Sequence, residues 1–129
     1  MPKAAAISTL IVDDQFSIRS LVRNGLQQIG FSDIREAPDG EDALRTLITR
    51  PAQLVISDFN MPKLDGIGLL RSIRAHEPIS KAAFIMLTGR ADLELLQRAK
   101  EFGVNNYVSK PFTVASLKQR IEAVFGKLA

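Results

Sequence analysis

The sequence contains no cysteine, which excludes disulfide scaffolds, zinc ribbons and thiol enzymes. It also lacks any apolar run near the roughly 18 residues that a membrane-spanning helix needs. The apolar stretch 4–12 resembles a signal-peptide core, but two hydroxyl residues interrupt it and an acidic pair follows it without a cleavage region. We therefore interpret 4–12 as a buried strand and expect a soluble protein of the cytoplasm.

The chain is too short for two ordinary domains and long enough for one hydrophobic core, with 129 residues of which 46% are hydrophobic. We expect one domain over residues 1–129. Basic residues outnumber acidic ones by 17 to 14, and residues 81–129 hold eight basic and four acidic groups. Such a surface suits an acidic protein or a nucleic acid, and the alternative is a set of scattered, solvated Lys and Arg side chains.

Five segments have the pattern of β-strands. Three short runs rich in branched apolar residues, at 7–12, 53–56 and 82–87, predict strands that are buried on both faces. Two half-polar segments, at 33–37 and 105–109, suit the edges of a sheet.

Amphipathic helical patterns separate these strands and end the chain. The first stops at Gly30, and the second and fifth begin at the predicted N-caps Asp39 and Thr113. Their apolar positions fall within 18–29, 43–48, 69–73 before Pro78, 95–102 before Gly103, and 117–125. Strands that alternate with helices predict a doubly wound α/β domain with a five-stranded parallel sheet and five helices.

Chemically reactive side chains follow four of the predicted strands. Asp13 and Asp14 follow the first strand, Asp58 the third, Thr88 the fourth and Lys110 the fifth. Because ligands of open α/β sheets bind beyond the carboxyl ends of the strands, we expect these groups to meet in one crevice. Three clustered carboxylates repel one another, and an all-oxygen ligand set favours Mg²⁺ as their partner.

Each of these residues also has a purely structural interpretation. Asp13 and Asp14 suit an N-cap, Asp58 a turn, Thr88 a cap of the fourth helix, and Lys110 a solvated loop. Suitable groups at four strand ends together are a more specific sign of a functional site than any one of these residues.

Five stretches together resemble the receiver domain of two-component response regulators, in particular the single-domain, CheY-like receivers of chemotaxis. They are Leu10–Asp14, Ala37–Leu44, Ser57–Gly66, Met86–Gly89 and Tyr107–Phe112. The resemblance covers nearly the whole chain. It implies the flavodoxin-like strand order 2-1-3-4-5, and because only residues 126–129 follow the last helix, no output domain is expected.

The resemblance implies a phosphorylation site at Asp58. This carboxylate would take a phosphoryl group from a phosphohistidine of a CheA-like sensor histidine kinase. Mg²⁺ would be held by Asp14, Asp58 and the backbone carbonyl of Asn60, with Asp13 acting through a water. The family's chemistry is limited to its own phosphorylation and slow hydrolysis, so we do not expect an enzyme in the usual sense.

The other roles implied by the resemblance concern the phosphoryl group and its surroundings. Lys110, before a cis proline, and the hydroxyl of Thr88 would contact phosphoryl oxygens, and Tyr107 would turn inward behind Thr88. Asn60 and Arg90 would flank the approach of water and so set the lifetime of the phosphorylated state. The sequence departs from the family at Phe59, where Trp is common, and His76 is interpreted as a surface residue at a helix end.

The leading functional hypothesis is a monomeric binding switch that acts on the flagellar motor switch protein. Its target would dock on the fourth helix, fifth strand and fifth helix, where we expect exposed cations at Arg98, Lys100, Lys118 and Lys127. The alternative is a phosphotransfer intermediate or phosphate sink that works with a histidine phosphotransfer protein. An aspartyl phosphatase is less favoured, since such enzymes place Asp-x-Asp on the first strand. Nucleic-acid binding is not expected either, because no helix-turn-helix follows the receiver pattern.

Overall fold

Five parallel strands form one sheet in a computed structural model that describes residues 1–89 and 92–129. The strands are β1 (Thr9–Val12), β2 (Ile34–Ala37), β3 (Leu54–Asp58), β4 (Ala83–Thr88) and β5 (Asn106–Ser109). The α-helices are α1 (Phe16–Ile29), α2 (Gly40–Thr49), α3 (Gly66–Ala75), α4 (Leu93–Glu101) and α5 (Val114–Phe125), and short 3₁₀ helices occur at η1 (Ala4–Ala6) and η2 (Glu77–Ile79). The strand order is β2-β1-β3-β4-β5, which confirms the expected doubly wound fold.

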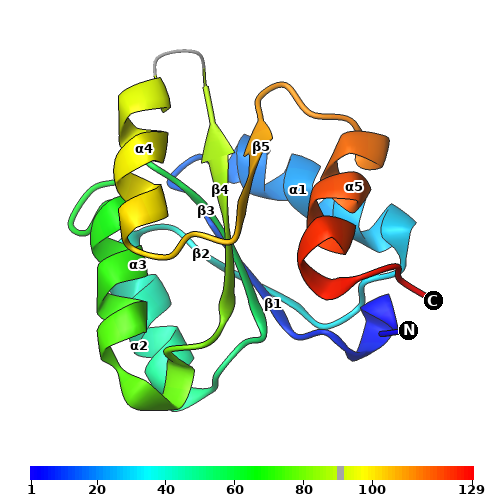
Figure 1. Ribbon diagram of the computed structural model, residues 1–129, viewed down its shortest axis with the longest axis horizontal. Coiled ribbons are helices and arrows are strands. Elements are labelled where there is room, and N and C mark those ends of the chain that lie inside the picture. The colour runs from blue at the N-terminus through cyan, green and yellow to red at the C-terminus, as the bar shows by residue number, and fades with distance from the viewer. Residues whose placement is uncertain (90–91) are drawn as a thin grey trace.

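Helices cover both faces of the sheet, and each face has its own hydrophobic core (Figure 1). Helices α2, α3 and α4 pack on one face around Leu10, Val55 and Phe84. Helices α1 and α5 pack on the other face around Ile11 and Ile85. Because neighbouring residues of a strand point to opposite faces, a central strand buried on both sides is mostly apolar, and the polar residues of β1, β3 and β4 lie at the strand ends.

The predicted difference between central and edge strands is confirmed. Every residue of β1, β3 and β4 is buried, whereas β2 and β5 at the two edges each have one buried residue. The sheet therefore ends on both sides in the half-polar segments that the sequence pattern indicated.

The strand predicted for the first apolar stretch, residues 4–12, is longer than the strand in the structure. Strand β1 begins at Thr9, whose amide donates to Asp33 O at 2.9 Å, and Ala4–Ala6 forms η1 instead. Before this point the backbone closes a short 3₁₀ turn, in which the Ile7 amide donates to Ala4 O. Contact with β3 begins at Ser8, whose carbonyl accepts from the amides of Gln53 and Leu54. Ala4 and Ile7 are nevertheless buried, as their apolar character required.

The helix ends follow the capping residues of the sequence. Asp39 accepts a hydrogen bond from the Asp42 amide, and Thr113 forms a capping box with Ser116. Gly30 follows α1 with φ +122°, a conformation that disfavours any residue with a Cβ. Helix α3 ends at Ala75, before Pro78, and His76 is its C-cap.

In the part of the chain that the structure describes, every helix is too short or too polar to cross a bilayer.

Candidate functional site

Three carboxylates meet where β1 and β3 end. Asp13 and Asp14 directly follow β1, and Asp58 is the last residue of β3. One carboxylate oxygen of each lies within 4.8 Å of the others. Asp13 is fully buried, Asp58 is 8% exposed and Asp14 faces solvent, so the cluster opens outward on one side. The structure thus brings together the acidic residues that the sequence placed at these strand ends.

Lys110 supplies a positive charge to this cluster. Its Nζ donates to Asp58 Oδ1 at 3.0 Å and lies 3.8 Å from Asp13 Oδ2. The residue follows β5, 52 positions along the chain from Asp58, and the sheet brings the two together. Lys110 is therefore not the solvated loop cation of the structural interpretation. The bond from Lys110 to Pro111 is cis, as the family resemblance implied.

Asp13 is the most constrained of the three carboxylates. Its Oδ1 accepts a hydrogen bond from the Gln15 amide at 2.9 Å, while its buried Oδ2 has no hydrogen-bond partner among the described residues. Burial raises the pKa of Asp13 to about 6; the charge of Asp58 adds to the rise, and the Gln15 amide and Lys110 oppose it. The N-cap of α1 is Gln15, so Asp13 does not have the capping role that was the alternative.

These features fit a hard divalent cation. A buried carboxylate oxygen without a hydrogen-bond donor is costly, and a cation nearby, or a water that the cation holds, relieves that cost. The donor set consists of carboxylate oxygens close enough together to share one ion, and Mg²⁺ binds through few carboxylates while keeping several waters.

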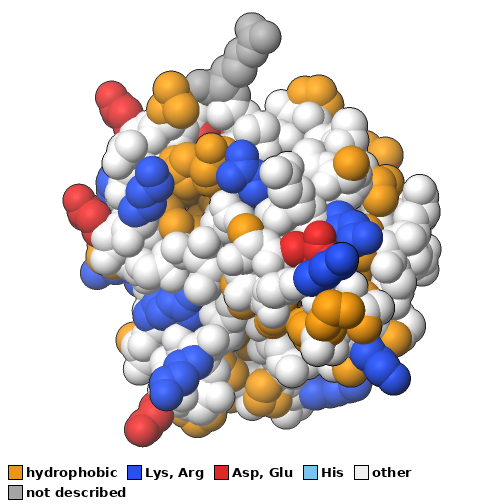
Figure 2. All heavy atoms as spheres, turned by 45° about the vertical axis from the view of Figure 1, so that its right-hand side comes forward, with side chains coloured by type: hydrophobic (Ala, Val, Ile, Leu, Met, Phe, Trp, Pro, Cys, Tyr) orange, Lys and Arg blue, Asp and Glu red, His pale blue; other side chains and the backbone are white. Residues whose placement is uncertain are grey.

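Thr88 and Tyr107 lie on β4 and on the edge strand β5, the two strands beyond β3 in the sheet. Thr88 ends β4, is buried, and its hydroxyl donates to Val108 O at 3.4 Å. Tyr107 on β5 is half-buried, and the guanidinium of Arg120 lies 4.4 Å from the centre of its ring. Both residues line a hollow of about 460 Å³ between α4 and β5, and Lys110 lines the same hollow. Figure 2 shows apolar side chains gathered in a depression of this face.

The loop after β3 carries Asn60, which is exposed, beyond the buried Phe59. Sequence reasoning assigned no role to Gly66, the residue at which this loop enters α3. Its amide donates to Phe59 O at 2.8 Å, and a Cβ at this position would lie 2.3 Å from the backbone oxygen of Asp58. Only glycine permits this approach, and the Asp-Gly pair at 65–66 was the available signal. Arg90, the other residue that we expected to affect lifetime, lies outside the described residues.

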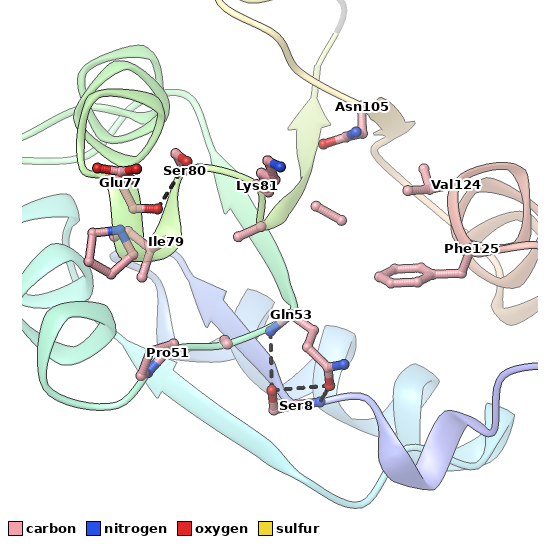
Figure 3. Close-up of a pocket in the computed structure, with 14 residues that line it drawn as sticks. Ser8, Pro51, Gln53, Glu77, Ile79, Ser80, Lys81, Asn105, Val124 and Phe125 are labelled. Carbon is pink, nitrogen blue, oxygen red and sulfur yellow. Dashed lines mark hydrogen bonds between the residues drawn. The ribbon is translucent and has the colours of Figure 1, made fainter.

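A second hollow, of about 860 Å³, lies at the opposite end of the sheet (Figure 3). Ser8 and Gln53 are joined there by hydrogen bonds across the starts of β1 and β3, facing the side chains of Val124 and Phe125. The charged residues of its lining are Glu77 and Lys81. Because it has no convergent carboxylates, it does not compete with the acidic cluster as the main site.

The basic residues of the C-terminal segment are exposed but dispersed. Arg98, Lys100, Lys118 and Lys127 all reach solvent, as predicted. Figure 2 shows Lys and Arg side chains spread singly over one face, with fewer acidic side chains between them. The net charge therefore creates a weakly basic face and not a continuous basic patch.

Comparison with known proteins gives a consistent result. The family model of the response regulator receiver domain matches residues 9–122. A Rhizobium etli protein named "Probable chemotaxis protein CheY" is 50% identical over 128 residues, which cover 99% of each chain. The structure of Vibrio cholerae chemotaxis protein CheY4 has a TM-score of 0.83 at 31% identity and covers 92% of this chain and 99% of that chain. A Pseudomonas aeruginosa sensor histidine kinase receiver domain, with magnesium coordinated in its active site cleft, has a TM-score of 0.83 at 26% identity, covering 94% of this chain and 98% of that chain.

Proposed function

The chain belongs to the response regulator receiver domain family, and we propose that it is a chemotaxis response regulator that is phosphorylated on Asp58. Receiver domains are signalling proteins and not enzymes in the usual sense. The proposal takes the whole chain as one receiver domain that works as a monomer in the cytoplasm. Its chemotaxis relatives favour this function over the phosphotransfer intermediate or phosphate sink.

One observation carries the proposal. The carboxylate of Asp58 lies at a strand end, 8% exposed, with the Lys110 ammonium 3.0 Å from Oδ1 and two further carboxylates alongside. A nucleophilic carboxylate next to a fixed cation and a potential metal site has the parts that phosphoryl transfer requires, because charge on the transferring oxygens must be neutralised.

Mg²⁺ is the proposed cofactor. Asp14, Asp58 and the backbone carbonyl of Asn60 would hold the ion, and Asp13 would act through a water. When bound, the ion neutralises charge on the transferring phosphoryl group and orients it.

The chain's own residues would carry out the transfer as follows. A carboxylate oxygen of Asp58 attacks the phosphorus of a phosphohistidine on a sensor histidine kinase. The new O–P bond forms as the N–P bond breaks, and the imidazole leaves with the electron pair and takes up a proton. Lys110 contributes its charge to a phosphoryl oxygen, and the Thr88 hydroxyl donates to another. Hydrolysis of the acyl phosphate by water then restores the Asp58 carboxylate and releases inorganic phosphate.

Phosphorylation would change the surface formed by α4, β5 and α5. Movement of Thr88 toward the phosphoryl group leaves room for the Tyr107 ring, which lines the same hollow. The target would be the flagellar motor switch protein, and the exposed cations of this face favour an acidic segment of it. Asn60 and Arg90, each two residues beyond a proposed phosphoryl contact in the sequence, would set the lifetime of the signal.

The test is phosphorylation by acetyl phosphate or a phosphorylated kinase in the presence of Mg²⁺, measured by intact-mass spectrometry. We expect the wild type to gain one phosphoryl group and Asp58→Asn to gain none, since the amide is not a nucleophile. Asp65→Asn is the matched control, because Asp65 is an exposed carboxylate that caps α3 and Asn is an equally good cap. Labelling of Asp58→Asn at the wild-type rate would reject the site.

A further inference from the structure

Arg19 ties the loop that carries the acidic pair to the edge of the sheet. Its Nη1 donates to the backbone oxygen of Asp13 at 2.7 Å, and its Nε donates to Glu36 Oε1 on β2 at 3.0 Å. The side chain of Arg19 is 15% exposed, so both bonds are largely shielded from water. A guanidinium presents several donors in one rigid plane, which suits it to hold two acceptors in a fixed relation.

Glu36 is itself held in place by a second arginine. Its Oε2 accepts from Arg23 Nε at 2.7 Å, and Arg23 Nη2 donates to Ile34 O at 3.1 Å. Burial raises the pKa of Glu36, but the hydrogen bonds from Arg23 and Arg19 outweigh it, so that the pKa lies below its ordinary value. Glu36 is therefore a stable anionic anchor. The two arginines share this anchor, but Arg19 bonds to the β1–α1 loop and Arg23 to β2.

The backbone of Asp13 is held on both sides. Its amide donates to Ala37 O at 3.2 Å, and its carbonyl accepts from Arg19. The helix that follows has no side-chain N-cap bond to fix the loop from that side. The side chain of Arg19 thus holds the Asp13 carbonyl at the point where the chain passes from Asp13 to Asp14.

From these contacts we propose that Arg19 is a positioning residue for the acidic pair, which it holds in the orientation that binds the divalent cation. This inference rests on the proposed function for the metal, but the contacts stand without it. Loss of a group that orients metal ligands commonly weakens metal binding by about tenfold or more.

The test compares Arg19→Gln with Arg23→Gln. Both variants remove one partner of Glu36, but only the first frees the carbonyl of Asp13. We expect Arg19→Gln to weaken Mg²⁺ binding by about tenfold in calorimetric titration. Arg23→Gln should stay within about twofold of the wild type. Arg19→Lys should lie between wild type and Arg19→Gln, because an ammonium keeps the charge but loses the planar pair of bonds.

A second measurement needs no metal. The Gln15 amide donates to Asp13 Oδ1, so its hydrogen exchange reports the orientation of that carboxylate. In metal-free protein we expect faster exchange of this amide in Arg19→Gln than in Arg23→Gln, when both are compared at matched global stability in urea unfolding.

Equal losses of Mg²⁺ affinity in the two variants would overturn the inference, because the cluster would then act only through general stability. Unchanged binding and unchanged Gln15 exchange in Arg19→Gln would overturn it as well. A wild-type protein that binds no Mg²⁺ would overturn the proposed function, and the exchange measurement would still decide whether Arg19 orients Asp13.

Discussion

At the residue scale, the buried carboxyl group of Asp13 makes stability depend on pH. Its pKa is raised from the ordinary 3.8 to about 6, first by burial and then by the charge of Asp58. The folded state therefore holds the proton at pH values where the unfolded state has lost it. As the pH rises from about 4 to about 6, this group lowers the free energy of unfolding, and above about 6 the loss is complete.

We expect metal-free Asp13→Asn to be more stable than the wild type at pH 7, by up to about 3 kcal/mol. The difference should shrink as the pH falls below about 6 and vanish near 4, because the wild-type carboxyl is then neutral too. Urea unfolding in the presence of a chelator at several pH values measures it. A difference that does not change with pH would contradict the raised pKa.

At the element scale, the first turn of α2 packs closely against the loop after β3. A Cβ added at Gly40 would lie 2.1 Å from the backbone oxygen of Leu64. A Cβ at Gly68 in α3 would instead lie 2.6 Å from Cδ1 at the flexible end of the Leu64 side chain. Leu64 thus presents its rigid backbone to Gly40 and the movable end of its side chain to Gly68.

Gly40→Ala should therefore destabilise the protein by about 1–3 kcal/mol, because α2 must move away from the loop. Gly68→Ala should be nearly neutral, since the gain of about 1 kcal/mol in helix propensity offsets the displacement of one side chain. Urea unfolding of both variants makes the comparison. The expectation fails if Gly68→Ala costs as much as Gly40→Ala.

At the scale of the whole molecule, the proposed metal site couples ligand binding to folding. The carboxylates come from two strands and are brought together only in the folded chain, so Mg²⁺ binds the native state preferentially. Binding then stabilises the whole domain and not one loop.

We expect Mg²⁺ at 100 times its dissociation constant to raise the free energy of unfolding by about 2.7 kcal/mol. Asp14→Ala should lose most of this increase, because one carboxylate ligand is gone. Glu77→Gln, which changes an exposed carboxylate at the far end of the sheet, should keep it. Thermal unfolding of each protein with and without Mg²⁺ measures the increase. An undiminished increase in Asp14→Ala would count against this residue as a ligand.

The sequence by itself determined the alternation of strands and helices, the distinction between central and edge strands, and the residues at the strand ends. These features follow from local periodicity, since a strand buried on both faces is a nearly continuous apolar run and a surface helix repeats its apolar positions every three or four residues. Asp39 and Thr113 were predictable as caps for the same reason: the cap bonds reach only three residues along the chain. The strand order 2-1-3-4-5 came from the family resemblance, because periodicity contains no information about which strands are neighbours.

The tertiary structure alone decided where β1 begins, which of two adjacent aspartates is buried, and how Arg19 reaches both Asp13 and Glu36. Strand β1 begins at Thr9, where the chain gains a backbone acceptor on the β2 side, Asp33 O. Asp13 is buried and Asp14 is exposed, although the two are adjacent in the sequence and equally polar. The contact of Lys110 with Asp58 joins residues 52 positions apart. Such contacts depend on the register and packing of distant segments, and those are set by the free energy of the whole fold and not by any local pattern.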